Sequence, residues 1–273
     1  MAGAALLVTL SVIGGSILRL GPFAATPASA VTDPEEIVTG TLQAFLDAAT
    51  VHVDLEVMGT LPAGVAGVPG NAAAALDLTG ASIAADLDLA AVRSRVVVNV
   101  PSLSAEPIEL RTIWDVAWLR TGEGPWASAS VADAVSASGI DVNPLSLVDR
   151  LGAYLADHPE VAVRRGPDAA CAPGRCRVVT VEAGSAPLGL ISALLPAERA
   201  AHLPEGEGVV TILTDRATLR PSTVTFELRD PSDRPVLSVT MRFSAWNAVI
   251  PIEEPTAAPA TQPADEAAAG HGT

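Results

Sequence analysis

The stretch Val51-His-Val-Asp-Leu-Glu-Val57 decides the fold class. A valine or leucine stands at every odd position of this stretch, and a histidine or a carboxylate stands at every even position. Successive side chains of a strand point to opposite faces of a sheet. The pattern therefore predicts a half-buried strand with one apolar face and one solvent-exposed face, on which His52 lies.

The residues before this strand follow a different period. Thr32-Asp-Pro-Glu35 has the form of a capping box, with Pro34 near the first turn. Apolar residues then recur at helical spacing as far as Ala49. We therefore expect a helix that begins at this box and ends near Thr50.

The residues after the strand alternate between short apolar stretches and turn residues, which is typical of an antiparallel sheet. Further helical patterns occur at 144–157 and 187–201. With about ten strands and three helices that must cover one face, the predicted fold class is α+β. The further strands are predicted at 74–79, 82–89, 94–100, 107–114, 117–121, 160–165, 177–183, 208–215, 222–230 and 235–246.

The two ends of the chain differ from its centre. Residues 2–18 are an apolar run, and Ala28-Ser-Ala30 fits a signal-peptidase site. We read residues 1–30 as a signal peptide, with a retained membrane anchor or a buried structural helix as alternatives. Residues 31–252 are predicted to form one domain. Residues 253–273 are rich in Pro, Ala and acidic residues, and this composition predicts a disordered tail.

Both cysteines lie in Cys171-Ala-Pro-Gly-Arg-Cys176. A tight Pro-Gly turn brings the two thiols within bridging distance, and export favours oxidation. We therefore expect a local disulfide between Cys171 and Cys176. A metal site is the alternative, but it needs two more ligands, and none lies nearby.

Composition argues against several functional classes. The 273 residues carry 31 acidic and 16 basic side chains, for a net charge of −15, and every base is Arg. This balance disfavours nucleic-acid binding, which depends on neutralising phosphates. No catalytic motif occurs, and Asp86-Leu-Asp88 is read as a solvated strand face rather than a cation site. We expect no enzyme, no cofactor and no bound metal.

Several stretches resemble a known family. They are the helix that leads into 51–59, the hairpin 112–121 followed by Gly124-Pro-Trp126, the strand pair 209–215 and 219–226, and the ending 241–255. Together they resemble the LolA-like superfamily and, within it, the LppX/LprG-type lipoproteins of actinobacteria. The absence of a lipobox cysteine departs from that pattern.

The resemblance implies a strongly curved antiparallel sheet, a half-barrel, whose concave face is lidded by helices and holds acyl chains. We therefore expect a non-enzymatic extracytoplasmic carrier or binder of lipids or lipoproteins. The alternative is a sensor or interaction module of LolA-like fold that binds a membrane protein. The expected partners are a lipid or acylated ligand and either a membrane surface or a membrane-embedded transporter. We expect an exported monomer, on the outer face of the cell membrane, in a periplasm-like space or secreted.

The candidate cavity residues are apolar side chains on predicted strands and helices. The helix at 187–201 is apolar on all sides, so it must be fully buried or contact a second apolar phase, and we expect it to form a lid. Ordinary core packing is the alternative for each of these residues. Trp114, Trp118 and Trp126 are read as packing or rim residues. The candidate cavity and lid residues are Val53, Leu55, Leu87, Val96, Val98, Leu151, Leu188, Ile191, Leu194 and Leu195.

Overall fold

The computed structural model describes residues 30–66, 74–133, 162–172, 174–182, 202 and 206–255. The helices there are α2 (Pro34–Leu46) and α3 (Ala63–Ala66), and residues 131–133 are also helical. The strands are β1 (Thr50–Pro62), β2 (Ala75–Asp77), β3 (Ala81–Asp88), β4 (Arg93–Asn99), β5 (Ile108–Ile113), β6 (Val116–Thr121), β7 (Ala127–Ser130), β8 (Ala162–Arg165), β9 (Ala169–Cys171), β10 (Gly174–Glu182), β11 (Glu207–Asp215), β12 (Pro221–Arg229) and β13 (Pro235–Ser244).

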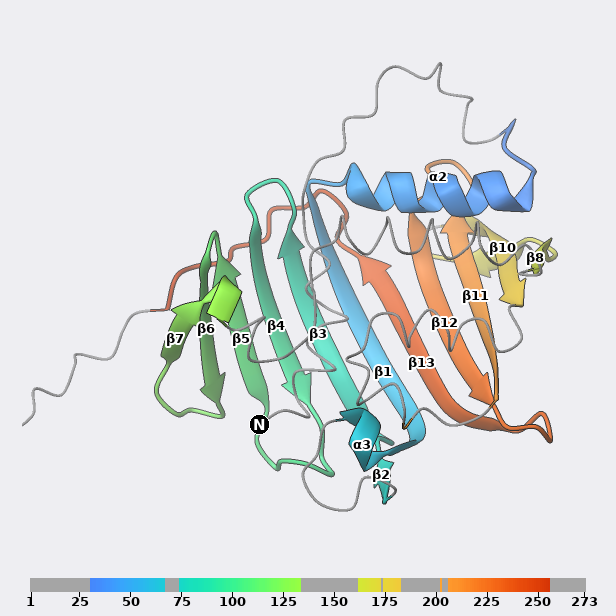
Figure 1. Cartoon of the computed structure of the whole chain (residues 1–273). Coiled ribbons are helices and arrows are strands. Elements are labelled where there is room, and N and C mark those ends of the chain that lie inside the picture. The colour runs from blue at the N-terminus through green and yellow to red at the C-terminus, as the bar shows by residue number, and fades with distance from the viewer. Residues whose placement is uncertain are drawn as a thin grey trace, which may run out of the picture.

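The strands form one open antiparallel sheet in the order β7-β6-β5-β4-β3-β1-β13-β12-β11-β10-β8, with β2 paired to β1 and β9 paired to β10. β1 and β13 meet at its centre, and a series of neighbouring strands extends from each of them (Figure 1). α2 crosses one end of the sheet in the same view. The predicted α+β half-barrel with a curved antiparallel sheet is confirmed.

Most of the predicted strands are present, with bounds shifted by a few residues. β7, β9 and the single turn α3 were not predicted, because their short segments lack a clear apolar period. The first helix ends at Leu46 rather than near Thr50. Its N-cap is Asp33 rather than Thr32: Asp33 Oδ1 accepts the backbone N–H groups of Glu35 and Glu36, at 2.9 and 3.1 Å. The carboxylate of Asp33 thus takes the place of the expected capping box.

α2 packs on one face of the sheet, which we call the inner face. Its fully buried Ile37 belongs to a cluster with Val179 of β10 and Leu219, the residue that precedes β12 by two positions. Val163 of β8 packs against this cluster. The hydroxyl of Thr41 lies 3.1 Å from that of Thr214 on β11. The other face of the sheet, which carries Asp54 and Glu56, is called the outer face.

Gly59 marks the point at which β1 leaves its long pairing with β13. Its φ is +114°, and a Cβ atom there would lie 2.2 Å from the carbonyl oxygen of Val236. Only glycine tolerates both the dihedral angle and the close approach. Beyond it, Thr60 to Pro62 pair with β2.

The expected disulfide is present: Cys171 and Cys176 are bonded, and they join β9 to β10.

The expected signal segment, the tail beyond residue 255 and the predicted helices at 144–157 and 187–201 lie outside the described residues. None of the helices in the described ranges has both the length and the apolarity that a membrane span requires.

Candidate functional site

The inner face presents continuous rows of apolar side chains across the sheet. One row passes through Met241, Leu55, Ile83 and Val98 on four adjacent strands, because the strand registers align these positions. On the other side of Met241 the same row continues through Val224, Ile212 and Val179. The inner face is therefore a hydrocarbon surface that runs from β4 to β10.

The sequence predicted five strand residues for this wall, and the structure places all five on the inner face. Leu55 and Leu87 are each 3% exposed, Val98 is 2% exposed, and Val96 is fully buried. Val53 is half-buried and packs against the same cluster. Their orientation agrees with the predicted register, while their role in ligand binding stays a prediction. Leu151, Leu188, Ile191, Leu194 and Leu195 lie outside the described residues.

The two halves of the inner face differ in burial. On β1, β3 and β4 the inward side chains are almost all fully buried. On β11, β12 and β13 most of the inward apolar side chains are only half-buried, whereas Leu228 and Leu237 are buried in the core. Sequence reasoning did not select the half-buried residues, although the alternation of apolar and polar residues in 235–246 could have revealed three of them. The half-buried inward residues are Val210, Ile212, Val224, Phe226, Val239, Met241 and Phe243.

Three aromatic side chains form a cluster between the C-terminal end of α2 and the end of β13. Phe45 of α2 lies edge-on to Phe243, with ring centroids 6.0 Å apart, and edge-on to Trp246, at 6.1 Å. Phe243 and Trp246 stack at 6.1 Å. All three pack against the main core cluster. The group fixes the C-terminal end of α2 on the sheet.

The outer face carries charged side chains in place of the apolar rows. His52 Nδ1 lies 2.6 Å from Asp86 Oδ1, and its Nε2 lies 3.3 Å from Asp54 Oδ1. Burial lowers the pKa of His52, but the hydrogen bond to Asp86 and the charges of both carboxylates outweigh it and raise the pKa above 6.5. Within the described ranges, the ion pairs and hydrogen bonds of the imidazole involve carboxylates alone.

Glu109 on β5 gathers three arginines from neighbouring positions of the outer face. Its carboxylate accepts hydrogen bonds from Arg95 Nε at 2.8 Å, Arg111 Nε at 3.0 Å and Arg120 Nε at 3.1 Å. Burial raises the pKa of Glu109, but the three guanidinium groups lower it by more, to about 2. The guanidinium groups of Arg111 and Arg120 also stand over the ring of Trp126, at 5.0 and 4.7 Å from its centroid. This cluster is a structural network that orders β4, β5 and β6.

The tryptophans fall into two environments. Trp126 packs under Arg111 and Arg120, as a packing residue. Trp118 is half-buried on the outer face, opposite Arg111. Trp114 is 62% exposed in the turn between β5 and β6, which makes it a rim residue.

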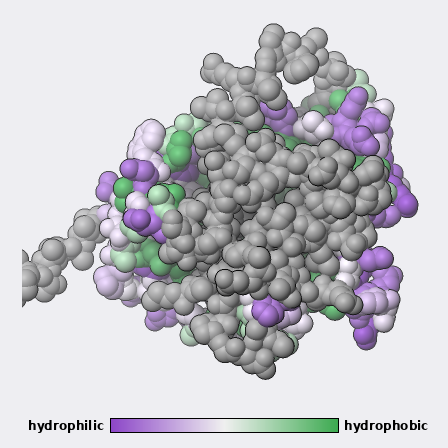
Figure 2. Space-filling model, viewed as in Figure 1, coloured by the Kyte–Doolittle hydropathy of each residue, from purple (hydrophilic) through white to green (hydrophobic). Residues whose placement is uncertain are grey.

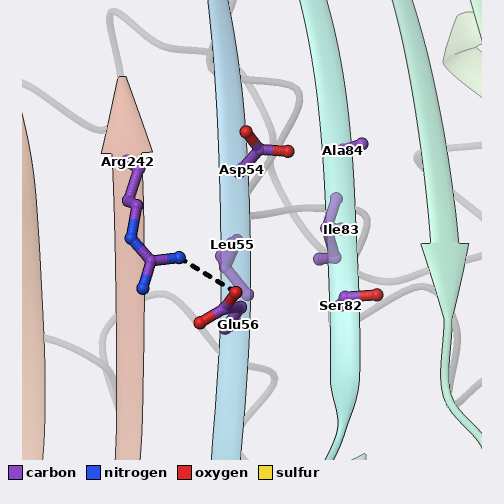
Figure 3. Close-up of a pocket in the computed structure, with 7 residues that line it drawn as sticks. All are labelled: Asp54, Leu55, Glu56, Ser82, Ile83, Ala84 and Arg242. Atoms are coloured by element: carbon purple, nitrogen blue, oxygen red, sulfur yellow. Dashed lines mark ion pairs between the residues drawn. The ribbon is translucent and has the colours of Figure 1, made fainter. Parts of the chain in front are cut away.

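A small pocket of about 200 Å³ lies at the centre of the outer face. Asp54 and Glu56 of β1, Ser82 and Ala84 of β3, and Arg242 of β13 contribute to its lining (Figure 3). Arg242 Nη1 pairs with Glu56 Oε1 at 2.9 Å on one side of it. Ligand pockets commonly exceed about 300 Å³ and are mainly apolar, so this polar depression does not fit an acyl chain.

The described ranges hold no group of three or more His, Cys, Asp or Glu residues that could bind a metal ion. Asp86 and Asp88 both lie on the outer face, as the sequence predicted. Asp86 pairs with His52 and Arg95, and Asp88 accepts the backbone N–H of Ala91. Both carboxylates therefore have protein partners.

Comparison with known proteins gives a match at the level of the fold. The lipoprotein LppX of Mycobacterium tuberculosis is 13% identical in sequence, with a TM-score of 0.50. The similarity covers 81% of this chain and 100% of that one. This chain has the LppX fold. The LppX-type resemblance drawn from the sequence is thus confirmed for the architecture.

Two other solved structures give weaker matches. A conserved protein of Thermus thermophilus is 9% identical over 79% of this chain and 88% of its own, with a TM-score of 0.36. The MucA/MucB complex of Pseudomonas aeruginosa gives 12% identity over 80% and 59%, with a TM-score of 0.32. No protein-family model matches the chain, and no curated protein sequence matches it.

Proposed function

We propose that this protein is a non-enzymatic, extracytoplasmic binder and carrier of lipids or acylated molecules. The acyl chains would lie against the inner face of the sheet. The observation that carries the proposal is the half-buried apolar wall of β11, β12 and β13. A solved structure with the same fold is that of a lipoprotein, which supports an extracytoplasmic setting.

The energetics favour a hydrocarbon ligand on this wall. Each methylene that leaves water gains about 0.8 kcal/mol, so a carrier must offer apolar contact along most of an acyl chain to compete with a membrane. The row from Val179 to Met241 crosses four strands with apolar side chains alone. Strands lie about 4.8 Å apart, so these four strands span about 14 Å, enough for roughly half of a long acyl chain.

The first experiment measures bound lipid directly. The protein is purified from its host without detergent, and its lipid content is determined by native mass spectrometry and by organic extraction. We expect a stoichiometric amphiphile in the preparation. Absence of bound lipid, together with failure of the delipidated protein to bind a fluorescent fatty acid, would contradict the proposal.

A pair of neighbouring substitutions on β13 localises the binding surface. Met241→Gln places an amide of similar volume on the inner wall, whereas Thr240→Gln places the same amide on the outer face. We expect Met241→Gln to lower lipid content and fatty-acid affinity several-fold, because the amide loses water without gaining a partner. Thr240→Gln should leave both unchanged. Equal effects of the two substitutions would place the ligand elsewhere.

A second candidate function is an interaction module that binds a membrane protein. One observation favours it: the edge strand β7 has the sequence Ala-Ser-Ala-Ser, all four residues are exposed, and β6 is its one strand neighbour in the described sheet. An exposed edge without charged or proline residues can accept a partner strand. Ser128→Pro would remove a backbone donor there. Loss of a co-purified protein with retention of lipid would favour this function.

A further inference from the structure

The inner face carries a buried arginine on β10, close to the end of the described sheet. Arg177 lies on β10 opposite Thr214 of β11, two residues before the inward-facing Val179. It is only 1% exposed. Thr214 is fully buried and touches Thr41 of α2 through its hydroxyl, so Arg177 lies in the row that α2 covers.

Two of the three nitrogens of the Arg177 guanidinium group lack hydrogen-bond acceptors. Its Nε and Nη1 atoms are buried and have no hydrogen-bond partner, and no ion pair joins Arg177 to an acid in the described ranges. The nearby hydroxyl of Thr214 donates to the carbonyl oxygen of Leu219, at 2.6 Å. A buried charge without a partner is strongly unfavourable in a folded protein. Such a group often marks the place of an ion or ligand that the structure does not contain.

The acids closest to Arg177 are engaged with other groups. Asp168 pairs with Arg165 at 3.0 Å and with Arg216 at 3.5 Å. Asp215 Oδ1 accepts the backbone N–H groups of Ala217 and Thr218, at 3.0 and 2.8 Å. Burial lowers the pKa of Arg177, and the positive charges of Arg165 and Arg216 lower it further. This corner therefore carries a local excess of positive charge in a chain whose net charge is −15.

We propose that Arg177 binds the anionic head group, a carboxylate or a phosphate, of an amphiphile whose hydrocarbon chain lies on the inner face. This inference rests on the proposed function. The geometry fits, because Arg177 and Val179 are two residues apart on one face, about 7 Å along the strand. A head group at Arg177 would direct its chain along the row from Val179 to Met241.

Arg177 is covered in the structure, and α2 packs on its neighbours Val179 and Thr214, so we expect a head group to enter when α2 moves away from β10. The contact between Thr41 and Thr214 is the one side-chain hydrogen bond between α2 and the sheet among the described residues. The remaining contacts of α2 there are apolar. Movement of α2 would therefore break little polar bonding. Figure 2 shows hydrophilic surface at the end of the molecule where α2 begins, beside β8 and β10.

The test compares two ligands that share one hydrocarbon chain. Oleate carries a carboxylate, and oleyl alcohol is uncharged. Binding of each to the delipidated full-length protein is measured by calorimetry, with inorganic phosphate as a third probe. We expect oleate to bind at least tenfold more tightly than oleyl alcohol, since hydrogen bonds to charged groups are strong when water is excluded.

Two substitutions separate a ligand-binding arginine from a structural one. Arg177→Met should weaken oleate binding by about tenfold to a hundredfold and change oleyl alcohol binding by less than twofold. The melting temperature of the ligand-free variant should stay equal or rise, because an unpaired buried charge is replaced by an apolar group. Arg164→Met, on the outer face of β8 and 68% exposed, should change neither affinity. If Arg177→Met does not fold, Arg177→Gln serves in its place.

The outcomes distinguish this inference from the proposed function. Equal affinities of the wild-type protein for oleate and oleyl alcohol would overturn the role of Arg177 and leave the apolar wall in place. Binding of neither ligand would overturn the proposed function itself. Stabilisation by phosphate alone that depends on Arg177, without a preference for oleate over the alcohol, would show a free-anion site and overturn the head-group assignment.

Discussion

The two faces of the same central strands are built on opposite principles. On the inner face of β1, β3 and β4, apolar side chains fill the space with almost no polar atoms among them. On the outer face, the charges of His52, Asp86, Arg95 and Glu109 are arranged in pairs across neighbouring strands. The inner face therefore contributes to stability through the tight packing of its side chains, and the outer face contributes through its ion pairs. Each face can be perturbed without touching the other.

The largest effect is expected from removing volume on the inner face. Leu55→Ala should lower the free energy of unfolding by roughly 2–5 kcal/mol, because Leu55 is 3% exposed and a cavity would remain. Met58→Ala on the same strand, where the side chain is 62% exposed, should change it by less than about 0.5 kcal/mol. Urea denaturation measures both. Equal losses for the two variants would contradict an apolar core on the inner face.

The next effect comes from the outer face. Glu109→Gln removes the negative charge from three arginines that then repel one another, and we expect a loss of about 2–3 kcal/mol in the free energy of unfolding. Glu123→Gln, at an exposed position in the turn after β6, is the control and should stay within about 0.5 kcal/mol. An unchanged stability of Glu109→Gln would show that the arginines find other partners.

At low pH, the free energies of unfolding of the wild-type protein and of Glu109→Gln should become similar. The pKa of Glu109 is lowered to about 2 in the folded protein, from 4.5. A lowered pKa contributes stability that is present above pH 4.5 and is lost as the pH falls from there through 2. The gap between wild type and Glu109→Gln, about 2 kcal/mol or more at pH 7, should therefore close near pH 2. A gap that does not vary with pH would argue for a steric role of Glu109.

The smallest effect concerns His52 and has the opposite sign. Its pKa is raised in the folded protein, so its contribution is fully present below pH 6.5 and is lost as the pH rises through the folded-state pKa. The wild-type protein should therefore lose up to about 1 kcal/mol of unfolding free energy between pH 6 and pH 9 through His52, and His52→Gln should not show this loss. Asp86→Asn should have a similar effect on that loss. If the free energy of unfolding of the wild type instead rose relative to that of His52→Gln as the pH increased, the contacts of His52 with the two carboxylates would be contradicted.

The sequence predicts the strands well where two faces differ in polarity. In β1 the odd positions are apolar and the even positions polar, and both the strand and its inward side chains follow from that pattern. The same holds for most of β3 and β13, whereas in β4 the inward Ser94 and the outward Val97 break the pattern. β7 consists of alternating Ala and Ser, and β9 of two Ala and a Cys, so neither carries a signal that separates two faces.

The candidate site was less accessible to sequence reasoning. Val210 and Ile212 stand in a stretch where Val209 and Leu213 are also apolar, so alternation cannot assign their face without the pairing of β11 with β12. Arg177 was missed for a related reason: an arginine beside Arg175 in a turn reads as solvent-exposed. α2, from a distant part of the sequence, packs on Val179 and Thr214 beside it, and this tertiary contact is not visible in the local sequence.

The pairing of β1 with β13 at the centre of the sheet has a consequence for the order of folding. The strands from β3 to β7 and from β11 to β13 pair with near neighbours in sequence, so these pairings can form quickly and independently. The central pairing of β1 with β13 joins residue 53 to residue 243, and it forms only after almost the whole chain is available. Until β13 pairs with it, β1 keeps one edge unpaired, and an unpaired edge can pair with another chain, so we expect aggregation of the folding chain to start at β1.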